Sequence, residues 1–219
     1  MYAEWAPEPA LAGRIACLWR HVSEDEGRRL VVPDGCVDLI WGPAGPFVAG
    51  PDTGPTHTSV RPGDTFIGIR FRPGAVGDFF GVPLPELRDQ RVPCDALDAL
   101  PTLEGPASLR PATLARLRAT SAPDRAASAI ATALRAGRGV REVARDLGFS
   151  ERQLRRRTVA GFGYAPKTLQ RVVRFQRALR LARSGRPFAQ VAVEAGYADQ
   201  AHLSHDVKRL SGVTLSGLL

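Results

Sequence analysis

The 219-residue sequence lacks the features of a membrane protein, a secreted protein or a disulfide-linked protein. No apolar run approaches the length of about 20 residues that a membrane-spanning helix needs. The first ten residues, MYAEWAPEPA, have neither the basic start nor the apolar stretch of a secretory signal. The three cysteines, Cys17, Cys36 and Cys94, form no CxxC pair, which argues against a disulfide framework, a zinc ribbon and a thioredoxin motif. We therefore expect a cytoplasmic protein with no contact to a membrane.

Motifs of the common enzyme classes are also missing. The sequence has no Gly-rich phosphate loop, no GxSxG nucleophile elbow and no HExxH metal-binding helix. Cys17, His21 and His57 could form a set of metal ligands, but their spacing is not diagnostic of any metal site. Asp34, Cys36 and Asp38 are also close together, but a turn that feeds a strand explains them more simply. We therefore expect no enzyme activity, no metal and no cofactor.

Lysine is nearly absent, and acidic residues are scarce in one half of the chain. Residues 121–219 hold 18 Lys and Arg against 7 Asp and Glu, a net charge of +11. Residues 1–120 hold 12 against 15, a net charge of −3. A compositional bias explains the preference for Arg over Lys, but not why acidic residues avoid the second half. The division indicates that the C-terminal half meets a polyanion, while the N-terminal half has another task.

The N-terminal half has the pattern of a small β domain, because short apolar runs alternate with Gly, Pro and Asp. The expected strands are Ile15–His21, Leu30–Val32, Val37–Trp41, Phe47–Ala49 and Phe66–Phe71. Short helical pieces are expected next, at Ala75–Phe80 and Leu84–Leu87, followed by a connecting helix around Ala112–Ala119. This pattern predicts an α+β protein with three parts: a small β-barrel-like domain at 1–100, a linker with a helix at 101–122, and an all-α domain at 123–219.

The all-α region contains an internal repeat, VREVARDLGFSERQLRR (Val140–Arg156) and FAQVAVEAGYADQAHLSH (Phe188–His205). In each copy a short helix ends at a glycine that can reverse the chain, an aromatic follows, and a capping residue starts a second helix. The corresponding positions are Gly148 and Gly196, Phe149 and Tyr197, Ser150 (with Gln153 as a capping box) and Asp199, and Leu154 and Leu203 as core anchors. Two such copies about 49 residues apart predict two helix-turn-helix units.

Other helices of this region are expected around the two units. A helix at Pro123–Ala136 precedes them, with Ser121 or Ala122 near its cap and Gly137 as its stop. A helix from Pro166 to about Ser184 joins them and would span roughly 28 Å. Such a rod would hold two recognition helices in successive major-groove segments on one side of a DNA duplex.

The second helix of each unit presents long polar side chains. These are Arg152, Arg155 and Arg156 in the first unit, and Gln200, Ser204 and His205 in the second. Arg and Gln are the side chains best suited to reading purine edges in the major groove. The alternative for Arg155–Arg157 is a solvated charge run, but three arginines on one face directly after a cap favour groove contact.

Residues 123–219 resemble the AraC-type DNA-binding domain. The resemblance covers both motifs, the joint GFGYAPKTLQ (Gly161–Gln170), RFQRALRLA (Arg174–Ala182) and GYADQAHLSHDVKRLSGVT (Gly196–Thr214). It implies seven helices, double-stranded DNA as the partner, and RNA polymerase as a further partner. It also implies base contacts from Arg152, Arg155, Arg156, Gln200, Ala201 and Ser204, and phosphate contacts from His202, His205 and Lys208.

The sequence departs from the family pattern at a few positions. Thr158 and Val207 stand where the family usually has an aromatic, and Leu215 stands where a proline usually follows the threonine. The first two changes imply less firmly anchored recognition helices. Ala201 offers no hydrogen bond, so the second unit is expected to read sequence more weakly than the first.

The N-terminal half resembles, more loosely, the β-rich domain that precedes this DNA-binding domain in a short-chain branch of the family. LAGRIACLWRH, VVPDGCVDLIW, AGPDT and GIRFRPGAV carry the resemblance, which implies a cupin-like barrel for sensing or dimerisation. Cys36, Asp38, Trp41 and Arg70 are the candidate contacts for a small-molecule effector. A simpler interpretation makes Pro33–Gly35 a turn that feeds a strand, with Cys36 as a small buried apolar residue.

Three functions remain open from the sequence. The first is a DNA-binding transcription regulator controlled by a small molecule in its N-terminal domain. The second is a redox- or alkylation-responsive regulator, which would need a reactive thiolate at Cys17, Cys36 or Cys94. The third is an architectural DNA protein whose barrel serves only for dimerisation. The sequence assigns no effector and no operator, does not separate an activator from a repressor, and is compatible with a monomer or a homodimer.

Overall fold

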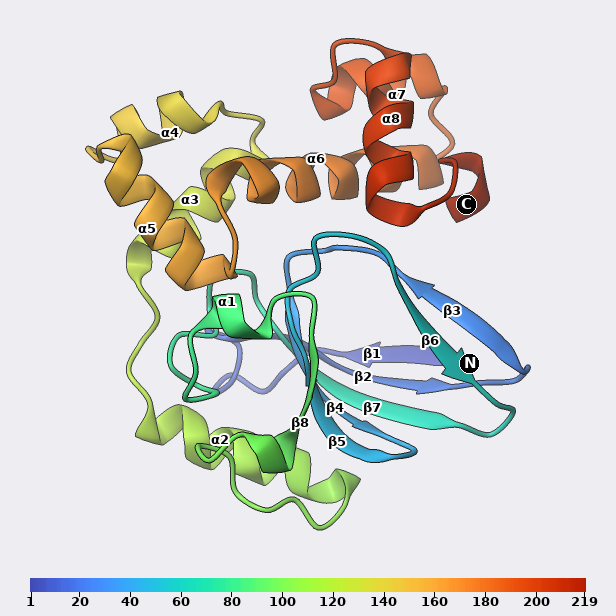
Figure 1. The fold of residues 1–219 in the computed structure, drawn as a ribbon, viewed down its shortest axis with the longest axis vertical. Helices are drawn as coiled ribbons and strands as arrows, with labels where there is room; N and C mark the ends of the chain where they lie inside the picture. Colours follow the sequence, from blue (N-terminus) through green and yellow to red (C-terminus); the bar gives the residue numbers. More distant parts are fainter.

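The computed structural model describes residues 1–219 and divides the chain into a β-rich N-terminal part and a helical C-terminal part (Figure 1). Eight antiparallel strands build the N-terminal part. They are β1 Tyr2–Trp5, β2 Ile15–Val22, β3 Gly27–Val31, β4 Val37–Gly42, β5 Gly45–Ala49, β6 Thr56–Val60, β7 Thr65–Phe71 and β8 Arg91–Pro93. A six-stranded sheet has the order β1-β2-β7-β4-β5-β8, and β3 pairs with β6 in a separate two-stranded sheet.

Side-chain alternation along the central strands separates two interiors. On β4, Leu39 and Trp41 pack into or against the main N-terminal core, together with Ile69 of the neighbouring strand β7. Ile40, between them in sequence, belongs to a small cluster on the opposite face of the sheet. Because successive side chains of a strand point to opposite faces, one strand serves both a packed core and the concave face beneath the two-stranded sheet.

All five expected strands form. Three further strands were not predicted, and one segment expected to be helical forms turns instead. Strands β1, β6 and β8 are short or polar, and their pairing depends on neighbours far along the chain. The helix expected at Ala75–Phe80 is wrong, because that segment forms successive turns. Gly74 and Gly77 flank and interrupt the segment with φ of +80° and +59°, a backbone conformation that ends a helix.

The helix between the two halves belongs structurally with the β-rich part. After α1 (Leu84–Leu87) and two short 3-10 turns, α2 spans Leu109–Ala119 (Figure 1). Leu109 is buried in the N-terminal core, and Leu114 and Leu117 pack against it. Arg116 Nε donates a hydrogen bond to the carbonyl oxygen of Phe79 at 2.8 Å. The segment expected as a linker therefore carries a helix that is docked on the β domain.

Six α-helices and a terminal 3-10 turn form the C-terminal part. They are α3 Arg125–Arg135, α4 Val140–Asp146, α5 Glu151–Phe162, α6 Pro166–Arg183, α7 Phe188–Ala195, α8 Gln200–Ser211 and the 3-10 turn Ser216–Leu218. The seventh helix that the family resemblance implied is thus a single 3-10 turn. The cap of α3 is also not where we expected it, because Asp124 accepts the hydrogen bond of the Ala126 amide. None of the helices combines the length and apolarity that a membrane span requires.

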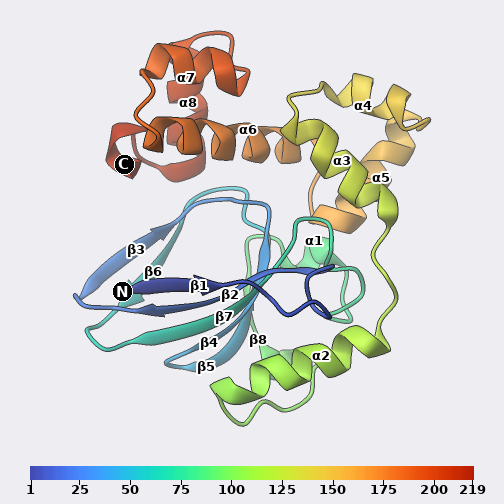
Figure 2. The ribbon, with the colours of Figure 1, turned by 180° about the vertical axis from the view of Figure 1, so that it is seen from behind.

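Helix α6 runs between two groups of helices, α3–α5 and α7–α8 (Figure 2), and contributes to two separate cores. Its first half contributes Leu169 and Val172 to the core with α3, α4 and α5. Its second half contributes Phe175 and Leu179 to the core with α7 and α8. Each core belongs to one helix-turn-helix unit, so one continuous helix fixes the relation between the two.

Candidate nucleic-acid interface and cavity

The first helix-turn-helix unit is built as its sequence pattern predicts. Gly148 adopts a φ of +67° after α4, which reverses the chain toward α5. At the start of α5 the Gln153 amide donates to Ser150 Oγ at 3.2 Å, and the Ser150 amide donates to Gln153 Oε1 at 2.9 Å. This reciprocal capping box satisfies two amides that the helix itself leaves unpaired. Leu154, 1 % exposed, then anchors α5 in the core.

The arginines of α5 divide between the surface and the interior of the unit. Arg152, Arg155 and Arg156 are exposed, and none of them forms an ion pair. Arg157 turns inward instead, where it pairs with Asp124 and its guanidinium lies 4.8 Å from the centre of the Phe149 ring. Helix α5 therefore carries three free guanidinium groups on one face, and a fourth, that of Arg157, has a structural role.

The second unit repeats the architecture with different chemistry. Gly196 has a φ of +85° at the end of α7, and the Tyr197 ring that follows is buried. The carboxylate of Asp199 caps α8 by accepting the His202 amide at 2.7 Å, and Leu203 anchors the helix. The exposed residues of α8 are Gln200, Ala201, Ser204, His205, Lys208 and Arg209.

His202 differs from the other residues expected at the interface. It is half-buried, and its ring stands edge-on to Tyr197 with 5.2 Å between the ring centres. One guanidinium nitrogen of Arg174 lies 3.4 Å from its Nε2. His202 thus packs within the second unit, whereas its expected contact with phosphate stays a prediction.

A buried ionic cluster that the sequence did not reveal holds α8 on α6. Asp206, 5 % exposed, lies 2.7 Å from Arg174 Nη2 and 3.6 Å from Arg171 Nε. The Arg174 guanidinium also covers the Tyr197 ring at 4.2 Å, and burial is the main cause that raises the Tyr197 pKa to about 12. The only sequence feature that could have indicated this cluster is that Asp206 is the single acidic residue of α8, while α6 is rich in arginine.

The two positions where aromatic residues were expected are filled by smaller buried residues. Thr158 is buried, and its hydroxyl donates to the carbonyl oxygen of Leu154 at 2.7 Å, four residues back in the same helix. Val207 is buried in the core of the second unit. Both helices therefore have a second inward anchor, although each is smaller than a ring.

A cavity of about 620 Å³ lies in the β-rich domain, between the six-stranded sheet and the β3–β6 pair. Its apolar wall includes Trp19, Ile40, Phe47, Val60 and Phe66. Its volume falls in the range of about 300–1,000 Å³ that is typical of small-molecule sites, and such sites combine an apolar wall with a few polar groups.

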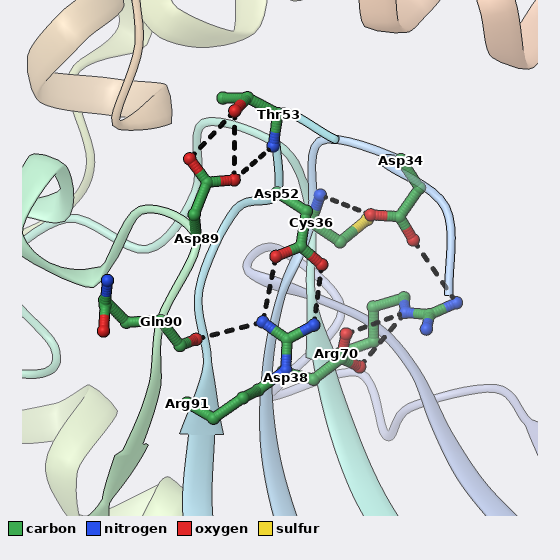
Figure 3. A network of polar contacts seen from close by, with 9 residues as sticks. All are labelled: Asp34, Cys36, Asp38, Asp52, Thr53, Arg70, Asp89, Gln90 and Arg91. Carbon is green, nitrogen blue, oxygen red and sulfur yellow. Dashed lines mark hydrogen bonds and ion pairs between the residues drawn. The ribbon is translucent and has the colours of Figure 1, made fainter. Parts of the chain in front are cut away.

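The polar groups of the cavity form two ion-paired clusters (Figure 3). Asp38, 8 % exposed, accepts hydrogen bonds from Trp19 Nε1 at 2.8 Å and from Arg70 Nε at 3.1 Å. Burial raises the pKa of Asp38 to about 6, although the neighbouring Arg70 opposes this change. In the second cluster, both carboxylate oxygens of Asp52 accept from Arg91, at 2.9 and 2.7 Å.

Three of the four expected effector residues line this cavity. Cys36, Asp38 and Arg70 lie in its wall. Trp41 does not, because it is on the other face of β4 and packs against the N-terminal core. The structure therefore does not bring Trp41 to the cavity with the other three, because an odd step along a strand changes the face.

The cysteines lack the surroundings of reactive thiols. Burial is the largest effect on all three, and it raises the pKa of Cys17 and Cys36 and brings that of Cys94 to about 11. A thiolate is the reactive form, so these sites disfavour the chemistry of an alkylation or redox sensor. The structure also does not gather Cys17, His21 and His57, or any other set of three His, Cys, Asp or Glu residues, into a group able to hold a metal ion.

These features define a β-rich domain with a cavity, followed by a tandem helix-turn-helix domain with exposed arginines. Residues 3–93 match a family described as a domain of unknown function (DUF6597), and residues 125–219 match a family described as a helix-turn-helix domain. No curated protein matches the chain.

Solved structures of ToxT from Vibrio cholerae share the fold of the whole chain. The 1.65 Å structure of its P21 form has a TM-score of 0.50 at 10 % sequence identity, covering 92 % of this chain and 97 % of ToxT. Unsaturated fatty acid-bound wild-type ToxT has a TM-score of 0.50 at 10 % identity, covering 93 % and 94 %. The chain thus combines a C-terminal part that matches a helix-turn-helix domain with an overall fold like that of ToxT. The α+β class expected from the sequence is thereby confirmed, as is a helix-turn-helix domain in the C-terminal part.

Proposed function

We propose that this protein is an AraC-type transcription regulator that reads one asymmetric duplex site with α5 and α8 in successive major-groove segments. We further propose that a small molecule in the N-terminal cavity controls this binding. The observation that carries the proposal is that α5 and α8 each expose polar side chains that form no ion pair, and that the single helix α6 connects the two units. Helix α6 has 18 residues and is therefore about 27 Å long at 1.5 Å per residue. Major-groove segments one turn apart are separated by about 34–36 Å. Because one unit packs on each half of α6, the length of α6 and the width of the units together come close to this separation.

The proposed base contacts come from the exposed side chains of the two faces. They are Arg152, Arg155 and Arg156 on α5, and Gln200, Ala201 and Ser204 on α8. His205 and Lys208, which are also exposed, and the half-buried His202 are proposed to lie near phosphates. RNA polymerase is the proposed protein partner, as expected for a transcription regulator that acts in the cytoplasm.

The cavity supports control by a small molecule. Its apolar wall would bury the body of a ligand, and Cys36, Asp38 and Arg70 would fix its orientation. A structural neighbour, ToxT, has been solved with an unsaturated fatty acid bound. We further propose that residues 1–122 form the sensor unit and residues 123–219 the DNA-binding unit, since α2 packs on the β domain and α3 begins at Arg125.

The test is the salt dependence of binding to a duplex selected by the full-length protein from a random pool. Contacts from many arginines to phosphates release counterions, so we expect log affinity to fall against log salt with a slope of roughly −5 or steeper. The measurement is fluorescence anisotropy of the labelled duplex between low and moderate salt. A flat response, or failure to enrich any sequence, would contradict the proposal.

A further inference from the structure

Two loops of the β-rich domain lie directly under the DNA-binding domain, and each also reaches the cavity. The first loop is Val32–Cys36, between β3 and β4, and the second is Pro51–Pro55, between β5 and β6. In Figure 1 both loops arch beneath α6 and α8. Asp34 and Asp52, the cavity carboxylates in Figure 3, lie one on each loop.

The first loop touches both halves of the DNA-binding domain. Val32 packs against the core of the second unit. The carbonyl oxygen of Pro33 accepts a hydrogen bond from Gln176 Nε2, in the middle of α6, at 2.7 Å. Gly35 faces Tyr164, in the joint between α5 and α6, and a Cβ on Gly35 would lie 3.3 Å from the Tyr164 hydroxyl. Three residues of this five-residue loop thus contact the core of the second unit, the middle of α6 and the joint after the first unit.

The Tyr164 hydroxyl is buried against this loop and has no hydrogen-bond partner within the protein. A buried hydroxyl without a partner costs roughly 1–3 kcal/mol relative to a paired one. A shift of the loop would change which carbonyl and carboxylate oxygens face this hydroxyl. The contact is therefore sensitive to the position of the loop.

The two loops are held to the cavity with unequal strength. Asp52 is buried and makes two short hydrogen bonds to Arg91, whereas Asp34 is one-third exposed and its Oδ2 lies 3.7 Å from Arg70 Nη1. Asp38 already occupies the Nε edge of Arg70. The terminal nitrogens of Arg70 are thus open donors in the cavity, and Asp34 is the partner of Arg70 most easily replaced.

We propose that the loop Val32–Cys36 couples the cavity to the DNA-binding domain. A ligand with a carboxylate or carbonyl oxygen takes over the terminal nitrogens of Arg70 from Asp34, and the freed loop changes its contacts with Gln176 and Tyr164. This inference rests on the proposed function, because it explains how the cavity would control DNA binding. It identifies Asp34, Gln176 and Tyr164 as positioning residues that contact neither DNA bases nor the body of the ligand.

The test is a double-mutant cycle in the full-length protein, without any ligand. Asp34→Asn keeps the side-chain oxygen that accepts the Cys36 amide (2.8 Å) but removes the charge that pairs with Arg70. Gln176→Ala removes the hydrogen bond to the loop from the other side. Asp64→Asn is the matched control, because Asp64 accepts the Arg61 amide (2.8 Å) in a turn that does not touch the DNA-binding domain.

We expect Asp34→Asn to change the dissociation constant for the selected duplex at least threefold, since coupling between two sites usually changes binding affinity about fivefold or more. Gln176→Ala should change it in the same direction, and the double variant should go no further than the larger single effect. Asp64→Asn should change it less than 1.5-fold. Independent, multiplicative effects of the two substitutions, or no effect of Asp34→Asn, would overturn the coupling while DNA binding itself stands.

A second readout does not depend on DNA. Hydrogen exchange of the amides in Gly161–Gln176 should become faster in Asp34→Asn than in wild type and Asp64→Asn, because the loop no longer holds the joint. Unchanged exchange there overturns the proposal. If the wild-type protein binds no duplex at all, the proposed function fails, and the exchange result still decides whether the loop links the two domains. Tyr164→Phe keeps the ring and removes a buried hydroxyl that has no partner, so it should not lower the midpoint of thermal unfolding and should reduce the Asp34→Asn effect on exchange.

Discussion

The two helix-turn-helix units have the same architecture, but the first exposes charged side chains on its second helix, whereas the second buries an ion-paired cluster between α6 and α8. In the first unit, three arginines of α5 point to solvent, and its inward pair, Arg157 with Asp124, is partly exposed. In the second unit, the carboxylate of Asp206 is buried on α8 between Arg171 and Arg174, and the outward face carries mainly uncharged polar side chains.

In the first unit, the residues that anchor the recognition helix are different from those that are free to contact DNA. The first unit is held by an apolar anchor and a capping box, so its arginines remain available for contacts. The second unit uses two arginines of α6 for internal structure. We infer that the first unit mainly specifies sequence, and that the second mainly positions the protein on the duplex.

The largest effect should come from removing the buried carboxylate of the second unit. Asp206→Ala leaves Arg171 and Arg174 facing each other in a half-buried site, and losing one partner of a buried pair is costly. We expect a loss of about 2–4 kcal/mol in the stability of α7 and α8, measured by native-state hydrogen exchange.

The matched substitution in the first unit is Asp124→Ala, which removes a helix cap and a partly exposed ion pair. Its expected cost in α3 and α5 is about 1 kcal/mol. Equal losses in the two units, or a larger loss from Asp124→Ala, would show that the buried cluster does not distinguish them.

Local features made the helix-turn-helix units predictable. Gly148, Gly196, Ser150 and Asp199 act on their own neighbours within three residues, so their spacing alone carries the information. The Asp206 cluster was not predictable in this way, because it joins α6 to α8 across 32 residues. The inward turn of Arg157 depends equally on Asp124, 33 residues earlier.

The β-rich domain was predicted less completely for the same physical reason. Its strands pair with partners that are distant in sequence, as in the register of β1 with β2 and of β4 with β7. Cys36, Asp38 and Arg70 were chosen for their residue types, and the register brings them to one wall. Trp41 lies outside this wall, because the packing of β4 decides which face of the strand meets the core. The coupling loop had no sequence signal beyond its Pro-Asp-Gly turn.

An intermediate effect is expected on base preference. Arg152→Ala or Arg156→Ala should relax the selected sequence in one half of the site, because an arginine that binds a guanine edge with two hydrogen bonds contributes about 1–3 kcal/mol of discrimination. Lys208→Ala should weaken binding to all sequences alike, since a phosphate contact carries no base information. The measurement is affinity selection from a random duplex pool, performed in parallel for each variant.

Gln200→Ala is the informative control for this division, because it removes the longest uncharged side chain of the α8 face. We expect it to change the selected motif less than either arginine substitution does. A larger change from Gln200→Ala would reverse the roles of the two units.

The smallest effect is a loss of protection in α3 at low pH. Burial alone would raise the pKa of Asp124, but the Ala126 amide and the Arg157 guanidinium outweigh burial and lower it. A carboxylate whose pKa is lower in the folded protein contributes stability that is complete above its unfolded pKa of about 3.9, and this contribution is lost as the pH falls through the folded value. We therefore expect the protection of α3 amides, corrected for intrinsic exchange, to fall between pH 5 and pH 3 by an amount equivalent to about 0.5 kcal/mol. Asp124→Asn keeps a capping oxygen that does not titrate, so α3 should lose less protection over this range than in wild type. If the two proteins lose protection equally, the acid sensitivity of the first unit comes from another carboxylate, and Glu142, whose pKa is lowered by Arg138 and the Gly139 amide, is the next to substitute.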